Sequence, residues 1–128
     1  MIMNGERSYQ DFTTLELWRK ARALKNEIFQ LVQKFPSIEK FRLSDQMIRA
    51  SRSVGASIAE GHGRFSYKEQ IHFCIICRGS LSELRNHFID AYDCKYILKE
   101  ELQQFILKVK EVERLANGYI TYLRAKNI

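Results

Sequence analysis

The sequence predicts an all-α protein, an antiparallel up-down-up-down four-helix bundle. Proline occurs once and glycine six times in 128 residues, and this scarcity favours long helices over many short strands. In addition, apolar residues recur at alternating steps of three and four in four long segments. This spacing places them on one face of a helix. Because short joints make neighbouring helices antiparallel, we expect an alternating bundle.

The first two helices are expected near residues 13–35 and 44–61. Pro36 cannot continue the first helix, and Ser44 is the expected N-cap of the second. Asp45 would then lie near the positive end of that helix. The predicted core positions are Leu17, Ala21, Leu24, Ile28, Leu31 and Phe35 in the first helix, and Met47, Ser51, Val54 and Ile58 in the second.

The third and fourth helices are expected near residues 66–95 and 99–124. Ser66 and Glu69 have the spacing of a capping box that opens the third helix. The chain is predicted to form a single domain over residues 1–128, in which residues 1–12 are an irregular N-terminal segment. The core positions are Cys74, Cys77, Leu81, Leu84, Phe88 and Ala91, followed by Leu102, Phe105, Val109, Val112, Ala116, Tyr119 and Leu123.

The composition is that of a globular protein, with 45% hydrophobic and 28% charged residues. No apolar run reaches 18 residues, so we expect no membrane span. The first residues contain no basic stretch followed by an apolar one, so no secretory signal is expected. Three cysteines fit a reducing compartment, and the predicted location is cytoplasmic.

The net charge of +6 is spread along the chain. Residues 1–36, 37–96 and 97–128 each carry a net charge of +2, so there is no basic arm. A diffuse positive charge permits association with polyanions without requiring it.

The second and third helices have more apolar or small surface than one bundle core requires. Between Ala50 and Ala59, seven of ten residues are Ala, Ser or Gly, which suggests close approach on more than one side. The third helix carries isoleucines away from its core stripe, and exposed apolar patches mark interfaces. We therefore expect self-association; the alternative is a thick single core. The interface candidates are Gly55, Ala56, Ile71, Ile75, Ile76 and Ile89.

No motif predicts catalysis, a metal or a cofactor. Cys74 and Cys77 lie within a helical stripe, and His72 points about 160° from Cys74, so four ligands cannot converge as zinc requires. Buried thiols that act as small hydrophobic groups are the expected alternative. No Ser or Cys has a His one turn away, and no glycine-rich loop follows a strand. We expect a protein that is not an enzyme.

The loop Gly61-His62-Gly63-Arg64 has two interpretations. In the first it is a turn: Gly61 adopts a left-handed conformation after the helix, Gly63 is a second permissive position, and Ser66 caps the next helix. In the second the free N–H groups of the third helix, with Arg64 and Lys68 beside them, bind an anion such as a nucleic-acid phosphate.

Arginines on the second and third helices also have two interpretations. Arg49 and Arg52 lie away from the core stripe of one helix, whereas Arg78 and Arg85 lie seven residues apart on the other. In the first interpretation they form ion pairs between helices or subunits, with Glu60 and Glu83 as partners for Arg78. In the second they line a surface for RNA or DNA. Trp18 and Phe29 are interpreted as packing residues.

Three segments resemble one bacterial family. They are LELWRKARAL (15–24), LSDQMIRASRSVGASIAEGHGR (43–64) and RGSLSEL (78–84), and the resemblance extends from about Asp11 to Tyr122. The chain is similar to the 23S ribosomal RNA intervening-sequence proteins, a family of four-helix bundles. It differs where that family commonly has a proline and an asparagine, because Gly55-Ala56-Ser57 stand there. Loss of the proline should leave this helix straighter.

The resemblance implies a cytoplasmic homo-oligomer, a ring of five bundles with a basic surface or channel. The chain also resembles the accessory bundle protein of diversity-generating retroelements, which is associated with nucleic acid and a reverse transcriptase. We therefore expect a non-enzymatic, self-associating accessory protein that contacts RNA or DNA; the alternative is a homo-oligomeric scaffold for a protein partner. The predicted phosphate contacts are Arg49, Arg52, Arg64, Lys68, Arg78 and Arg85.

Overall fold

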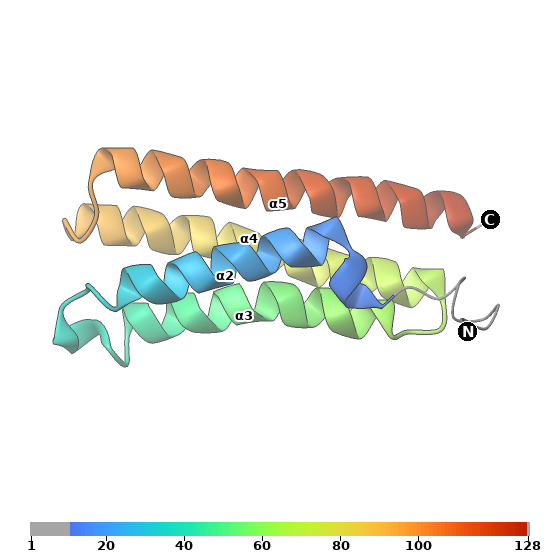
Figure 1. Ribbon diagram of the computed structural model, residues 1–128, viewed down its shortest axis with the longest axis horizontal. Coiled ribbons are helices and arrows are strands. Elements are labelled where there is room, and N and C mark those ends of the chain that lie inside the picture. Colours follow the sequence, from blue (N-terminus) through green and yellow to red (C-terminus); the bar gives the residue numbers. More distant parts are fainter. Residues whose placement is uncertain (1–10, 128) are drawn as a thin grey trace.

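Four long helices run alternately up and down in the computed structural model, which describes residues 11–127 (Figure 1). They are α2 (Glu16–Val32), α3 (Leu43–His62), α4 (Tyr67–Asp93) and α5 (Lys99–Lys126). The 3-10 turns η1 (Phe12–Thr14) and η2 (Ser37–Glu39) precede α2 and α3. The predicted fold class is confirmed. The irregular segment predicted for residues 1–12 lies almost wholly outside the described residues.

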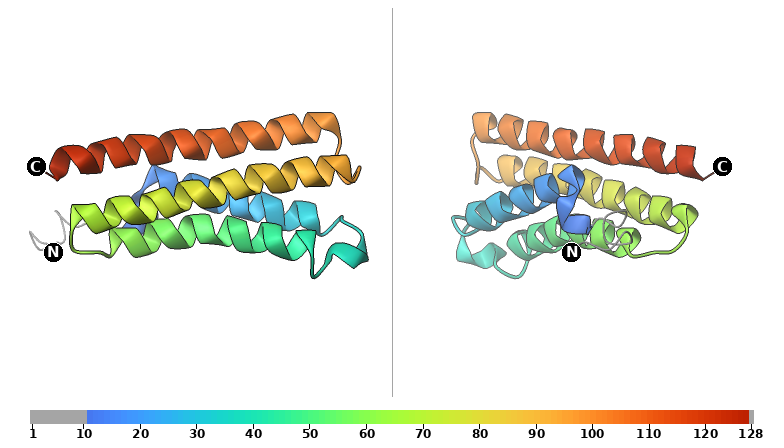
Figure 2. Two further views of the ribbon diagram at one scale, coloured as in Figure 1. Left: turned by 180° about the vertical axis from the view of Figure 1, so that it is seen from behind. Right: turned by 45° about the vertical axis from the view of Figure 1, so that its right-hand side comes forward.

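The helices pack in chain order, α2 on α3, α3 on α4 and α4 on α5, and α2 also contacts α5. The joints α2–α3 and α4–α5 lie at one end of the bundle. The α3–α4 turn lies at the other end, together with the start of α2 and the end of α5 (Figures 1 and 2). Residues far apart in the sequence therefore meet at this second end.

The core consists largely of the predicted stripes. All predicted core positions of the first three helices are buried, including Ile28, Met47 and Phe88, which have no exposed surface. In α5 the stripe is buried from Val109 to Leu123 except at Tyr119, which is half-buried, like Leu102 and Phe105 nearer the start. Phe105 stacks on Phe88 with ring centroids 4.8 Å apart, so it still joins α5 to α4.

The start of α3 differs from the prediction. Ser44 is not the N-cap: it lies inside the helix and is buried, because α3 begins one residue earlier, at Leu43. The residue at the cap position, Arg42, makes no side-chain cap hydrogen bond. Instead, the Leu43 backbone N–H donates to Glu39 Oε1 at 3.3 Å, so a carboxylate from η2 accepts a hydrogen bond from one of the free N–H groups at this helix end. The helix α2 is also shorter than predicted and ends at Val32.

Small residues on α3 are explained within the bundle. Ser53 of α3 and Ser80 of α4 form a hydrogen bond at 2.9 Å between their hydroxyl oxygens. At Gly61, a Cβ atom would lie 2.7 Å from Cβ of Phe73, so α3 and α4 approach too closely for any side chain there. On the opposite flank Gly55 faces the indole of Trp18 in α2. Much of the small-residue character therefore serves helix packing inside one chain.

Candidate nucleic-acid interface

The six predicted phosphate contacts do not form one surface. Arg85 pairs with Glu113 of α5 at 3.5 Å, so it lies on the α5 side of α4. Arg52 instead lies beside α2, where it lines a groove. Arg49 is on the outer face of α3, with 79% of its side chain exposed. The sequence pattern placed these residues on helix faces correctly but could not tell which faces adjoin.

Three of the six cations are already paired. Besides Arg85, Arg49 bonds to Asp45 at 3.0 Å and Arg64 to Glu60 at 2.6 Å. Exposed pairs of this kind contribute little to stability, but the neighbouring carboxylate weakens the attraction between the cation and a phosphate. Over residues 11–127, Arg52, Lys68 and Arg78 have no carboxylate within 4.0 Å.

The partners predicted for Arg78 are engaged elsewhere. Glu60 pairs with Arg64, and Glu83 Oε2 lies 2.9 Å from Nε2 of His87 on the same helix. The Nδ1 atom of His87 is buried and has no hydrogen-bond partner in the described chain. His87 lines none of the grooves and pockets described below, so we interpret this pair as part of the helix packing.

A groove between α2 and α3 gathers unpaired cations. Its volume is about 310 Å³. We name it the α2–α3 groove, and its lining residues are Trp18, Ala21, Arg22, Lys25, Ser51, Arg52, Gly55, Ala56 and Ala59. None of these residues is acidic. The floor is made of alanine, serine and glycine, and Ala56 is exposed there between the cationic side chains.

The cations of the groove come from both helices. Arg22 and Lys25 are one turn apart on α2, and Arg52 faces them from α3. Across residues 11–127 none of the three forms an ion pair. The Arg22 guanidinium lies 5.8 Å from the centre of the Trp18 ring, which positions it by a cation–π contact. The groove is therefore a concentrated positive site on a protein whose charge is otherwise diffuse.

Arg52 was a predicted phosphate contact, whereas Arg22 and Lys25 were not predicted. The signal was present in the spacing 18, 22, 25, which places an aromatic residue and two cations on one stripe of α2. Its meaning depended on the helix that lies opposite. Trp18 packs as predicted, edge-on against Phe12 with centroids 5.2 Å apart, but it also forms a wall of the groove.

The α3–α4 turn differs from the turn interpretation in the role of Gly61. Gly61 lies inside α3, since the helix extends to His62, and no described glycine has a positive φ. The prediction of a left-handed Gly61 is therefore wrong: this glycine is required by the contact with Phe73. Gly63 is the C-cap, with a right-handed φ of −78°. Gly61 is thus a packing glycine, not a turn glycine.

Ser66 is the N-cap of α4, but only half of the predicted capping box is present, since the Glu69 carboxylate accepts from the Ser66 hydroxyl and not from its backbone N–H. The Glu69 backbone N–H donates to Ser66 Oγ at 3.1 Å, and the Ser66 hydroxyl donates to Glu69 Oε2 at 3.2 Å. Glu69 also lies 4.0 Å from Arg64. Two carboxylates thus already surround Arg64, and the geometry favours a capped turn over an anion site at this helix end.

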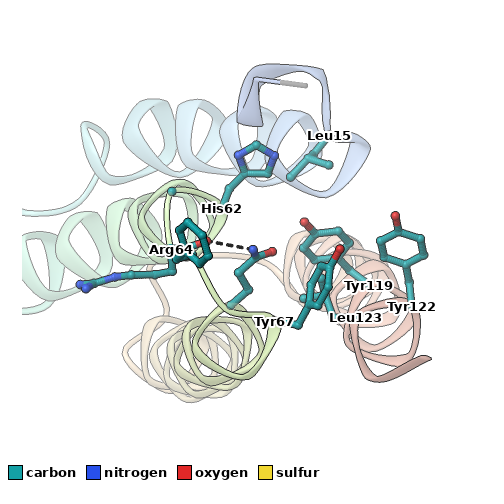
Figure 3. Close-up of a pocket in the computed structure, with 10 residues that line it drawn as sticks. Leu15, His62, Arg64, Tyr67, Tyr119, Tyr122 and Leu123 are labelled. Carbon is teal, nitrogen blue, oxygen red and sulfur yellow. Dashed lines mark hydrogen bonds between the residues drawn. The ribbon is translucent and has the colours of Figure 1, made fainter. Parts of the chain in front are cut away.

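A larger pocket lies at the same end of the bundle. It has a volume of about 940 Å³, and we name it the end pocket. Tyr67 of α4 and Tyr119 and Tyr122 of α5 cluster on one side, opposite Leu15 and His62 (Figure 3). The Arg64 guanidinium points away from the tyrosines. The remaining lining residues are Gly63, Arg64, Phe65, Gln70 and Leu123.

The end pocket is aromatic, and none of the described residues that line it carries a carboxylate. The rings of Tyr119 and Tyr122 are nearly parallel, at 14°, with centroids 6.0 Å apart. Burial raises the pKa of Tyr119 to about 12, so its phenol is neutral at physiological pH. The Gln70 amide donates to the Arg64 carbonyl at 3.0 Å and fixes the loop that closes one side of the pocket.

The cysteines do not form a reactive or metal-binding group. Burial raises the pKa of Cys74 to about 11 and that of Cys77 to about 12, so both remain protonated thiols, the form that does not bind metals. No cluster of three His, Cys, Asp or Glu side chains converges within residues 11–127. Cys94 is exposed at the far end of α4.

The predicted interface residues divide into two groups. Ile75, Ile76 and Ile89 are exposed by 45%, 39% and 47% of their surface. Ile71, in contrast, packs against a small core cluster of Cys74, Ile120 and Leu123 within the chain. Gly55 is covered by Trp18, and Ala56 is exposed in the α2–α3 groove. The exposed isoleucines of α4 are the part of the predicted interface that one bundle leaves open.

Fold and site together define a small basic α-helical bundle with a cationic groove. None of its described helices combines the length and apolar character needed to cross a membrane. The profile of the family described as 23S rRNA-intervening sequence protein matches residues 13–118. The chain belongs to this family, as the resemblance predicted.

One solved structure with the same fold comes from Bacteroides thetaiotaomicron. It is described as a protein of unknown function from the S23 ribosomal protein family. The two chains are 20% identical and superpose with a TM-score of 0.77 over 88% of this chain and 99% of the other. At this identity the likeness establishes the fold alone. No curated protein matches the chain.

Proposed function

We propose that this protein is a cytoplasmic, non-enzymatic, self-associating accessory protein that binds RNA or DNA by its phosphates. The observation that carries the proposal is the α2–α3 groove, in which Arg22, Lys25 and Arg52 meet with no carboxylate among the lining residues. Contacts of this kind hold a nucleic-acid backbone without reading its sequence. Family membership agrees with the proposal but assigns no activity.

The groove suits a phosphate chain better than a compact ligand. Two guanidinium groups and one ammonium group lie along it, and guanidinium groups form bidentate hydrogen bonds with phosphate. The small side chains of the floor allow the backbone of a ligand to approach α3. Trp18 offers one aromatic edge beside the cations, as is common in sites for single strands.

Self-association is the second part of the proposal. Ile75 and Ile89 are 14 residues apart and lie on one flank of α4, so an interface between copies would remove both from water. Because each is already about half-buried, each would contribute roughly half of the 1.5–3 kcal/mol that full burial of an aliphatic side chain contributes. The number of copies proposed from the resemblance is five. Light scattering should give a mass several times the 15.1 kDa of one chain, and Ile75→Lys should shift it toward the monomer.

A salt series tests nucleic-acid binding. Affinity for a fluorescent RNA or DNA oligonucleotide should fall linearly with salt on logarithmic axes, with a slope of about −0.7 to −0.9 per neutralised phosphate. The variants Arg22→Gln, Lys25→Gln and Arg52→Gln should each make the slope shallower by about 0.7–0.9. Arg114→Gln is the matched control, because it removes the same charge from α5, where Arg114 is paired with Glu111.

Two results would contradict the proposal. If neither RNA nor DNA binds at low salt, the rival function as a scaffold for a protein partner is favoured. If Arg114→Gln weakens binding as much as Arg52→Gln, only the net charge matters and the groove is not the site.

A further inference from the structure

We infer that the end pocket holds an unpaired nucleobase, so that the protein binds single-stranded nucleic acid in preference to a duplex. This inference rests on the proposed function and names the form of nucleic acid that the protein takes. The pocket lies at the end of the bundle where the α3–α4 turn meets α5, and its volume of about 940 Å³ is within the range of ligand sites (Figure 3).

The stacking surfaces come from two helices. Tyr119 and Tyr122 of α5 lie nearly parallel, and Tyr67 of α4 stands beside them (Figure 3). Tyr122 is 54% exposed and Tyr67 40% exposed, so part of each side chain is accessible to a ligand. Phe65, on the loop between α3 and α4, is fully exposed at the same pocket. Aromatic side chains gathered in this way are the usual means of holding a base without selecting its sequence.

The charges around the pocket suit a nucleotide rather than an acidic or purely apolar ligand. Among residues 11–127, no carboxylate lines it. The Lys126 ammonium lies 5.6 Å from the centre of the Tyr122 ring, at the edge of the tyrosine cluster. Lys68 follows Tyr67 directly on α4 and has no ion pair in the described chain. A phosphate attached to a base stacked on Tyr122 would therefore lie near the Lys126 ammonium, whereas Lys68, one residue after Tyr67, projects from a different face of α4.

The polar groups of the pocket match the edge of a base. Three phenol hydroxyls line the pocket, and each can donate or accept a hydrogen bond. In a duplex, by contrast, both faces of each base are stacked and its edge is paired. A base must leave the stack before it can enter such a pocket, which costs a few kcal/mol in a duplex and much less in a single strand.

The test compares single-stranded and duplex oligonucleotides of equal length at one salt concentration, with affinity measured by fluorescence anisotropy. Tyr122→Ala and Tyr67→Ala should weaken single-strand binding by about five- to 150-fold and leave duplex binding unchanged. Tyr92→Ala is the matched control: Tyr92 lies at the opposite end of α4 and is 38% exposed, close to the exposure of Tyr67. Arg52→Gln should weaken both kinds of binding.

A second measurement uses the unchanged protein, so it does not depend on how the variants fold. An oligonucleotide with abasic sites keeps its phosphates and loses its bases, and we expect it to bind at least fivefold more weakly than the intact strand. Equal binding of intact, abasic and duplex oligonucleotides would overturn the inference and leave the groove proposal standing. Absence of binding to all three would overturn both.

Discussion

The contact between Gly61 and Phe73 gives the sharpest prediction from the packing. A Cβ atom at Gly61 would lie 2.7 Å from Phe73 Cβ and 3.4 Å from the Gln70 carbonyl oxygen. The nearest atom is next to the backbone of α4, so it cannot move aside by a rotamer change, and the helices must separate. Gly61→Ala should therefore be destabilising even though alanine is the better helix former.

Gly79→Ala supplies the matched control. Gly79 lies inside α4, and nothing stands within 4 Å of the Cβ it would gain. Alanine should there stabilise the protein by about 0.8–1 kcal/mol, the difference in helix propensity. At Gly61 the same gain is opposed by an overpacking cost of about 1–3 kcal/mol. The propensity term cancels between the two variants, so their free energies of unfolding should differ by about 1–3 kcal/mol.

Urea unfolding followed by far-UV circular dichroism measures this difference, at one protein concentration because self-association would stabilise the fold. In thermal unfolding the same difference appears as a shift in melting temperature. Because the unfolding entropy of 128 residues is about 0.27 kcal/mol/K, the melting temperatures of the two variants should differ by about 4–11 °C. If Gly61→Ala is as stable as Gly79→Ala, the close approach of α3 and α4 is refuted.

Two further predictions concern local conformation and pH. Lys95 has a left-handed φ of 66° after α4, where the Tyr96 N–H donates to the Ala91 carbonyl at 2.9 Å. Because glycine adopts this conformation without steric cost, Lys95→Gly should stabilise the protein by about 0.5–1 kcal/mol. The same urea assay measures this change, and a loss of stability would contradict the prediction. Burial raises the pKa of Cys74 to about 11 and that of Cys77 to about 12 from 9.0, so the folded state keeps protons that the unfolded chain releases. Stability should be full below about pH 9 and should fall as the pH rises toward 11–12; a free energy of unfolding that stays constant from pH 8 to pH 10.5 would contradict the burial.

The core could be predicted because its signal is local. A residue such as Ile28 or Phe88 is buried when its neighbours three and four positions away are apolar, and the sequence alone contains that pattern. The N-cap bond between Ser66 and Glu69 is local in the same sense, since its two partners are three residues apart. The helix ends were less predictable: Ser44 was displaced as a cap by Glu39, a residue of the preceding turn.

The candidate site could be predicted only in part. Arg52 was identified from its position on an outer helix face, but its neighbours Arg22 and Lys25 lie about 30 residues earlier in the chain. Glycines were also misleading. A helical pattern does not distinguish a glycine that ends a helix from one that allows a neighbouring helix to approach, as Gly61 does for Phe73.

By itself, the sequence determined four amphipathic helices, their order and most of the side chains that they bury, with exceptions in α5. These features depend on interactions within one turn, and the period of the helix turns sequence spacing directly into position. The tertiary structure alone decided that α2 lies against α3 with its cations facing Arg52, and that tyrosines of α4 and α5 meet at one end. Such contacts depend on how the helices are rotated and paired, and that choice is made by packing over the whole core.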